Sequence, residues 1–139
     1  MQHTKKIEWI LRLGVAGEFI GHGLLAIEGK QDWIGWISKM IYVSTPTATT
    51  LLLFIGISDL IVALIILIKP MSWILLWAAF WAFWTALVRP LVGVGWLDFV
   101  ERSANWAAPL ALFFMVDRYS TVKKWLNPYN LFFNLKNRN

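Results

Sequence analysis

The chain contains no cysteine, and this absence limits the chemistry that it can carry. Without a thiol it forms no disulfide bond, no cysteine-ligated metal centre and no iron–sulfur cluster of its own. It also cannot pass electrons through a thiol relay. Thiol-based redox chemistry is therefore excluded for this chain acting by itself.

Charged side chains are also scarce. They make up 15 % of the 139 residues, whereas a soluble domain has about 25 %. Hydrophobic residues make up 58 %, and the chain contains 10 Trp residues. Trp is enriched at membrane boundaries because its apolar ring carries a polar N–H group. We therefore expect a small integral membrane protein with one domain, because there is too little charge to cover a surface facing water.

Four stretches of the chain are long and apolar enough to be membrane-spanning helices, which need about 20 residues each. They cover residues 7–27, 47–68, 71–88 and 99–116. The first stretch is long and is followed by no small-residue cleavage site, so no cleavable signal peptide is expected. The expected fold class is all-α, an integral membrane four-helix bundle formed by residues 1–117.

A further short helix is expected between the first two spans. Five apolar residues recur there at helical spacing, namely Trp33, Trp36, Ile37, Met40 and Ile41. Such an apolar face predicts a helix that lies in the membrane interface. After the fourth span, residues 118–139 form a basic tail.

The basic residues between the spans predict the orientation of the chain. Lys5, Lys6 and Lys69 share one side with the five basic residues of the tail. Because Lys and Arg are enriched on the cytoplasmic side, both termini are expected in the cytoplasm, with the chain integral to the plasma membrane (the inner membrane of a bacterium). We therefore interpret the net charge of +5 as the charge that orients the chain in the membrane. No nucleic-acid partner is expected, because the basic residues line no single face; the lipid bilayer is the expected partner.

Polar residues within the spans are the candidate functional residues, since burying an ionisable group in a bilayer costs about 2.5–3.5 kcal/mol. The candidate ligand-binding residues are Glu18, His22, Asp59, Trp81, Arg89, Glu101, Arg102 and Asn105. Helical spacing places Glu18 beside His22, and Trp81 on one stripe with Arg89. The charged residues are expected to meet in the outer half of the bundle, with Asp59 beneath them.

Glycines on the first span add to this expectation. Gly14, Gly17 and Gly21 lie close to the face that carries Glu18. Small residues let a neighbouring helix come close. We therefore expect Glu18 and His22 to point into the bundle.

Each candidate also has a purely structural interpretation. An ion pair between Glu18 and an arginine can fix helix packing without any activity. His22 can hydrogen-bond a carbonyl group, and the row of Trp73, Trp77, Trp81 and Trp84 can serve packing or anchoring. No second histidine lies in the predicted spans, so no haem or metal site is expected.

Several motifs resemble those of DoxX-like membrane proteins. They are Arg12–Gly14 and Gly21–Gly23 in the first span, Arg89–Pro90 at the end of the third, and Glu101–Leu110 in the fourth. The resemblance covers residues 6–116 and leaves out the tail. It implies a four-helix membrane bundle associated with redox chemistry, since relatives are linked to thiosulfate:quinone oxidoreduction and to thiol-oxidative-stress complexes. The lack of cysteine puts a thiol oxidoreductase in doubt, but a quinone-binding subunit stays open.

Three functions are compatible with these features. The first is a membrane subunit that binds a lipophilic redox molecule such as a quinone for an oxidoreductase partner; His22 or Arg89 would donate a hydrogen bond to it, and Glu18 would hold or move the proton. The second is a transporter of a small solute or proton that uses Asp59 and Glu18, which would require a homo-oligomer. The third is a non-catalytic assembly protein. No nucleophile–base pair or phosphate loop is recognised, so the chain is not expected to be an enzyme by itself.

Overall fold

The computed structural model describes residues 2–116, and these form helices and no strand. The helices are α1 (Gln2–Ile27), α2 (Gln31–Ile41), α3 (Thr45–Ile68), α4 (Ser72–Val92), α5 (Trp96–Glu101) and α6 (Ser103–Val116). The predicted all-α class is thus confirmed. The predicted basic tail, residues 118–139, lies outside the described residues.

Three of these helices, α1, α3 and α4, are long and apolar enough to cross a membrane. Local signals explain where α3 begins and ends. Pro46 lies in its first turn, where a missing N–H costs no hydrogen bond, and Pro70 follows the last residues, which disfavours further helix. α4 continues beyond the predicted end at residue 88 and stops at Gly93, whose φ of 97° is left-handed.

The predicted fourth span is divided. α5 ends at Glu101 and α6 begins at Ser103, so the expectation of one helix over residues 99–116 is wrong at Arg102. The backbone N–H of Arg102 donates to the carbonyl groups of Phe99 and Val100, which tightens the chain into a turn. With 14 residues, α6 is shorter than the length of about 20 that one spanning helix needs. A fourth crossing stays a prediction, in which α5 and α6 would act together.

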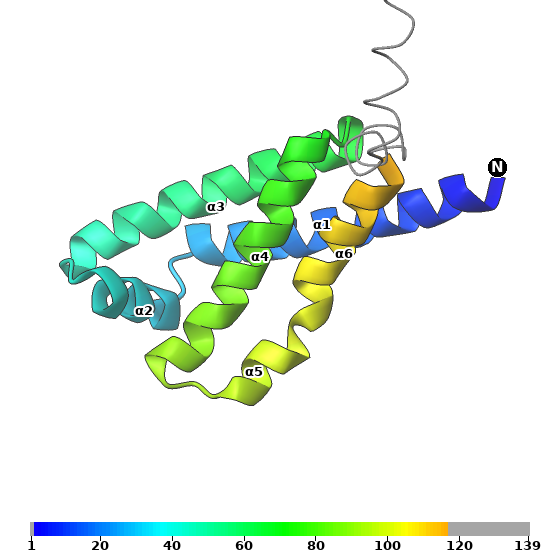
Figure 1. The fold of residues 1–139 in the computed structure, drawn as a ribbon. Helices are drawn as coiled ribbons and strands as arrows, with labels where there is room; N and C mark the ends of the chain where they lie inside the picture. Colours follow the sequence, from blue (N-terminus) through cyan, green and yellow to red (C-terminus); the bar gives the residue numbers. More distant parts are fainter. Residues whose placement is uncertain (1, 117–139) are drawn as a thin grey trace, which may run out of the picture.

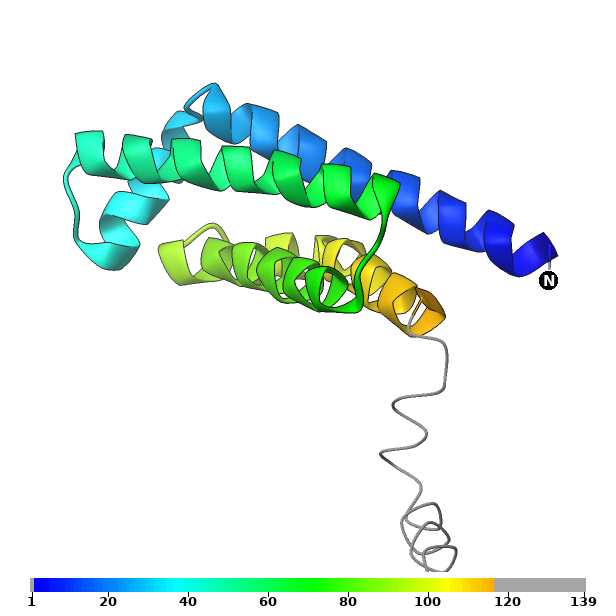
Figure 2. The same cartoon turned by 90° about the horizontal axis from the view of Figure 1, so that it is seen from above.

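The helices are arranged in two layers (Figures 1 and 2). α1 and α3 lie side by side in one layer, α4 and α6 form the other, and α2 lies at one end of the pair of layers. The N-terminus, the α3–α4 link and the end of α6 lie toward one end of the molecule, whereas α2 and α5 lie toward the other. This arrangement agrees with an antiparallel path from helix to helix.

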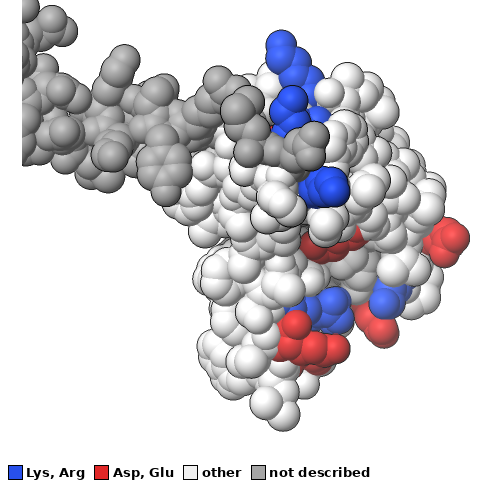
Figure 3. Space-filling model, turned by 90° about the vertical axis from the view of Figure 1, so that its right-hand side faces the viewer, with Lys and Arg blue, Asp and Glu red and all other residues white. Residues whose placement is uncertain are grey.

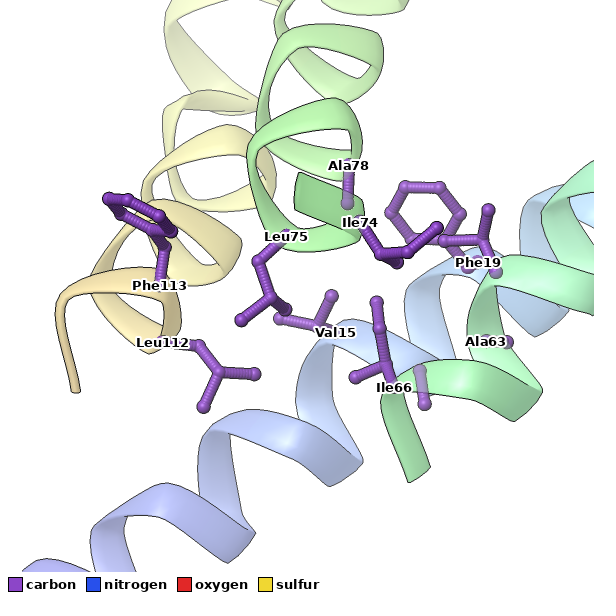
Figure 4. Packing of buried hydrophobic residues seen from close by; sticks show 11 residues of the cluster. Val15, Phe19, Ala63, Ile66, Ile74, Leu75, Ala78, Leu112 and Phe113 are labelled. Atoms are coloured by element: carbon purple, nitrogen blue, oxygen red, sulfur yellow. The ribbon is translucent and has the colours of Figure 1, made fainter. Parts of the chain in front are cut away.

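The hydrophobic core lies between the two layers, near the α3–α4 link. Each long helix and α6 contribute a large, fully buried aliphatic side chain to it: Val15, Ile66, Leu75 and Leu112. Figure 4 shows these side chains pointing toward one another. The core therefore fixes the helices at the end that holds the link.

α1 and α3 come into backbone contact through two glycines. A Cβ atom added at Gly23 would lie 2.8 Å from the carbonyl oxygen of Gly56, and one added at Gly56 would lie 2.7 Å from that of Gly23. Only residues without a side chain allow this approach. The expectation that Gly14, Gly17 and Gly21 admit a neighbouring helix is wrong, since a Cβ there would meet no other part of the described chain within 4 Å.

The outer surface of the helices is largely apolar. Exposed large side chains include Ile10 and Leu13 on α1, Phe54 on α3 and Phe80 on α4. Uncharged atoms cover most of the face in Figure 3, with charged side chains gathered in a few places. A surface of this kind is compatible with contact to lipid.

Candidate functional site

A cavity of about 440 Å³ lies between α3 and α4, with α2 along one side and α1 contributing one residue. Its lining is mostly aliphatic and aromatic. The volume falls within the range of about 300–1,000 Å³ that is usual for small-molecule sites. The core fills the space between the layers at the link end of α3 and α4, and the cavity occupies the part nearer α2.

Aromatic rings form much of the wall. α4 contributes Trp77, Trp81 and Trp84, and α2 contributes Trp33 and Trp36. The rings of Trp77 and Trp81 are stacked, with centroids 5.8 Å apart and planes inclined by 15°. The α4 tryptophans share a face because they are three or four residues apart. Their arrangement gives a flat ligand faces on which to stack.

Trp73, the remaining member of this row, serves as a contrast. It does not line the cavity, and 64 % of its surface is exposed. Trp73 therefore suits the structural interpretation, namely anchoring at a boundary, whereas the other three face the cavity.

Asp59 and Trp81 form the polar part of the wall midway along α3. Asp59 is only 5 % exposed, and its carboxylate accepts a hydrogen bond from the Trp81 side chain. Both residues line the cavity. The contact joins α3 to α4 and satisfies an acid that would otherwise be buried without a partner.

Arg89 lies near the end of α4, eight residues beyond Trp81 and so about 12 Å further along the helix. It lines the cavity and is 9 % exposed. Its guanidinium group lies 5.1 Å from the ring centre of Trp36, which is a cation–π contact. Nearby, the Lys39 ammonium group donates to the Val92 carbonyl at 3.2 Å. These two contacts hold α2 against the end of α4.

His22 is the residue that α1 contributes to the cavity. Its ring meets the edge of Trp33, with centroids 5.3 Å apart. The positive charges of Arg102, Arg89 and Lys30 all act on this histidine. The end of the cavity near α2 therefore has a positive environment.

Glu18, Arg102 and Asn105 form a separate group between α1 and the α5–α6 turn. The Glu18 carboxylate interacts with the Arg102 charge and accepts a hydrogen bond from the Asn105 side chain. None of the three lines the cavity. In residues 2–116 the only ion pair is the one between Arg12 and Glu8. The expected ion pair between Glu18 and an arginine is therefore not formed there, and Arg102 acts on Glu18 at longer range.

The eight candidate residues thus divide into two groups and an outlier. His22, Asp59, Trp81 and Arg89 share the cavity, and Glu18, Arg102 and Asn105 lie beside it. Glu101 is exposed and does not line the cavity, although its charge acts on Arg89. The described residues hold no cluster of three or more His, Cys, Asp or Glu side chains suited to a metal ion.

The sequence predicts that the apolar face of α2 lies in the membrane interface, and it gives no sign that this face lines the cavity. All five residues of this face line the cavity: Trp33, Trp36, Ile37, Met40 and Ile41. Their helical spacing was the correct signal for a shared face, but the spacing does not say what the face contacts.

Comparison with known proteins gave no match to a family model, to a curated protein or to a solved structure. The DoxX-like resemblance therefore remains a prediction from sequence motifs. The roles of the residues have to be argued from the cavity itself.

Proposed function

We propose that the protein is a DoxX-like subunit of the plasma membrane that binds a small lipophilic redox molecule, a quinone in the simplest case, for an oxidoreductase partner. One observation carries the proposal: a single cavity among the helices combines stacked tryptophan rings with a few polar side chains. Sites for small molecules commonly have this composition, with apolar walls for affinity and a few polar groups for orientation.

The chain's own residues would bind and orient the ligand. Trp77 and Trp81 offer ring faces to a planar head group, and His22 and Arg89 can donate hydrogen bonds to its carbonyl oxygens. Reduction of a quinone to a quinol takes up two electrons and two protons. We assign the electrons to the partner protein, because this chain has no thiol relay.

Two acids, the buried Asp59 and the partly buried Glu18, are suited to hold the protons. Asp59 lines the cavity, and its charge acts on Glu18 in the neighbouring group. In this proposal Asp59 exchanges a proton with the ligand, and Glu18 exchanges it with the α1–α6 side. Carboxyl groups inside a membrane protein commonly mark proton relays.

The proposed topology has four crossings, with α5 and α6 together making the fourth. Both termini then lie in the cytoplasm, as the lysines flanking α1 and α3 indicate. The end of the molecule that holds α2, α5 and the positive part of the cavity would face outward.

Binding of a short-chain quinone to purified protein tests the proposal. We expect saturable quenching of tryptophan fluorescence with one site per chain, and an affinity about threefold to tenfold lower for Trp81→Phe, which loses part of the stacking surface and a polar contact. Trp73→Phe is the matched control and should bind as the wild type does. Quenching that stays linear with quinone concentration, or that is equal in the two variants, would exclude this cavity as the quinone site.

A further inference from the structure

Arg89 is buried, and no acid among residues 2–116 forms an ion pair with it. The residue is 9 % exposed, and its buried Nε atom has no hydrogen-bond partner within residues 2–116. The charges of Asp98 and Glu101 act on it, but neither acid forms an ion pair with it. A buried guanidinium group normally has its charge compensated and its five N–H donors satisfied.

Within residues 2–116, the negative charges of Asp98 and Glu101 act on Arg89 without forming an ion pair, and nearby positive charges oppose them. The Trp36 ring face provides a weak attraction for the cation. Arg102 and Lys30 add positive charge close to the same end of the cavity, since both act on His22 together with Arg89. A neutral carbonyl group could accept hydrogen bonds there, whereas an anionic group would also bring a negative charge into contact with the guanidinium group.

We propose that this end of the cavity binds the anionic head group of a single-chain amphiphile, a carboxylate or phosphate that forms a bidentate contact with Arg89. The inference rests on the cavity of the proposed function and goes beyond that function, because it assigns to the same cavity an anionic ligand, a class to which a neutral quinone does not belong. The apolar chain extends from Arg89 along the tryptophan wall. A guanidinium fork is well suited to the two oxygens of such a head group.

Asp59 determines which way the ligand points. It lies beside Trp81, which is about 12 Å from Arg89 along α4. A negative head group is repelled from this carboxylate and attracted to the guanidinium. The two charges therefore orient an acidic amphiphile with its head toward α2 and its chain toward the middle of α3.

Native mass spectrometry of the full-length protein in a neutral detergent tests the inference with three probes that share one oleyl or oleoyl chain. They are oleate, lysophosphatidate and oleyl alcohol, the last of which lacks the charge. We expect one anion bound per chain, with an affinity at least about tenfold higher than that of the alcohol. Preference for oleate would identify a carboxylate head, and preference for lysophosphatidate a phosphate head; either supports the inference.

Two substitutions locate the charge preference. Arg89→Gln should remove the preference for the anions and leave the affinity for the alcohol unchanged. Arg89→Lys should retain part of the preference because the positive charge remains. Arg12→Gln is the matched control, since Arg12 is paired with Glu8 away from the cavity, and should keep the full preference. Equal binding of anions and alcohol in the wild type, or a preference that survives Arg89→Gln, overturns the inference. If Arg89→Gln does not fold, the wild-type comparison and Arg89→Lys still decide.

The same protein sample separates this inference from the proposed function. Binding of a neutral quinone without binding of either anion would overturn the anionic ligand and leave the quinone proposal standing. Binding of an anion without any quinone would support the inference and refute the quinone. Failure of all the probes would overturn both.

Discussion

Asp59 and Trp81 show how one hydrogen bond makes a buried acid tolerable between two apolar helices. The carboxylate is 5 % exposed and accepts from the Trp81 side chain. Without this bond, an indole N–H and a carboxylate would both be buried unsatisfied, at about 1–3 kcal/mol or more for each. The pair is therefore structural as well as part of the cavity wall.

Substitutions at Asp59 should separate hydrogen bonding from shape. Asp59→Asn keeps an acceptor for Trp81, so we expect a change of about 1 kcal/mol or less in the free energy of unfolding. Asp59→Leu leaves the indole N–H unsatisfied and should destabilise the protein by about 1–3 kcal/mol. Thermal unfolding in detergent measures both.

A double substitution provides the control for this prediction. Asp59→Leu combined with Trp81→Phe removes both partners, so part of the lost stability should return. If Asp59→Asn were as damaging as Asp59→Leu, the charge and not the hydrogen bond would be what stabilises the pair.

At the scale of the helices, the contact between α1 and α3 depends on two facing glycines. Gly23 and Gly56 bring the two backbones so close that a methyl group on either would overlap the carbonyl oxygen of the other. Close backbone approach is how helices associate where lipid removes most of the hydrophobic driving force. This contact also sets the position of His22, which immediately precedes Gly23.

Alanine substitutions at the glycines of α1 and α3 should therefore differ in sign. Gly23→Ala and Gly56→Ala force α1 and α3 apart, and we expect a loss of about 1–3 kcal/mol in the free energy of unfolding. Gly17→Ala and Gly21→Ala meet open space, and should be neutral or stabilising by up to about 1 kcal/mol, since Ala favours helix over Gly. Unfolding of the four variants in one detergent gives the comparison; equal effects at all four positions would contradict the close contact.

At the scale of the whole molecule, both ends of the described chain lie toward one end of the helix layers. Lysines are present at this end, in α1 and in the link after α3. In the proposed topology this end faces the cytoplasm, as the positive-inside rule predicts. The opposite end carries α2 and α5.

The cysteine-free sequence allows this topology to be tested directly, because any single cysteine introduced is the only reactive thiol. His3→Cys and Lys69→Cys should react with a membrane-impermeant maleimide only from the cytoplasmic side. Gln31→Cys and Trp96→Cys should react only from the opposite side, in intact cells and not in inverted vesicles. Labelling of Trp96→Cys from the same side as Lys69→Cys would contradict the proposed crossing by α4.

Local features of this protein could be predicted from its sequence. Three of the spans predicted from runs of apolar residues lie close to helices α1, α3 and α4. The length of an apolar run and the prolines beside α3 are signals that neighbouring residues carry. Helical spacing also correctly placed Trp81 and Arg89 on one face, since both line the cavity. These features depend only on residues within a few turns of one another.

Which helix faces meet depends on how the helices pack and could not be predicted from local sequence. In the folded chain the apolar face of α2 lines the cavity, and Glu18 lies beside Asn105 outside the cavity. The close contact between α1 and α3 is made by Gly23 and Gly56. The folded chain also has a turn at Arg102, where no glycine or proline marks a break. The physical reason is that helix rotation and crossing are set by packing between distant segments, and one apolar face suits lipid, a neighbouring helix and a cavity equally well.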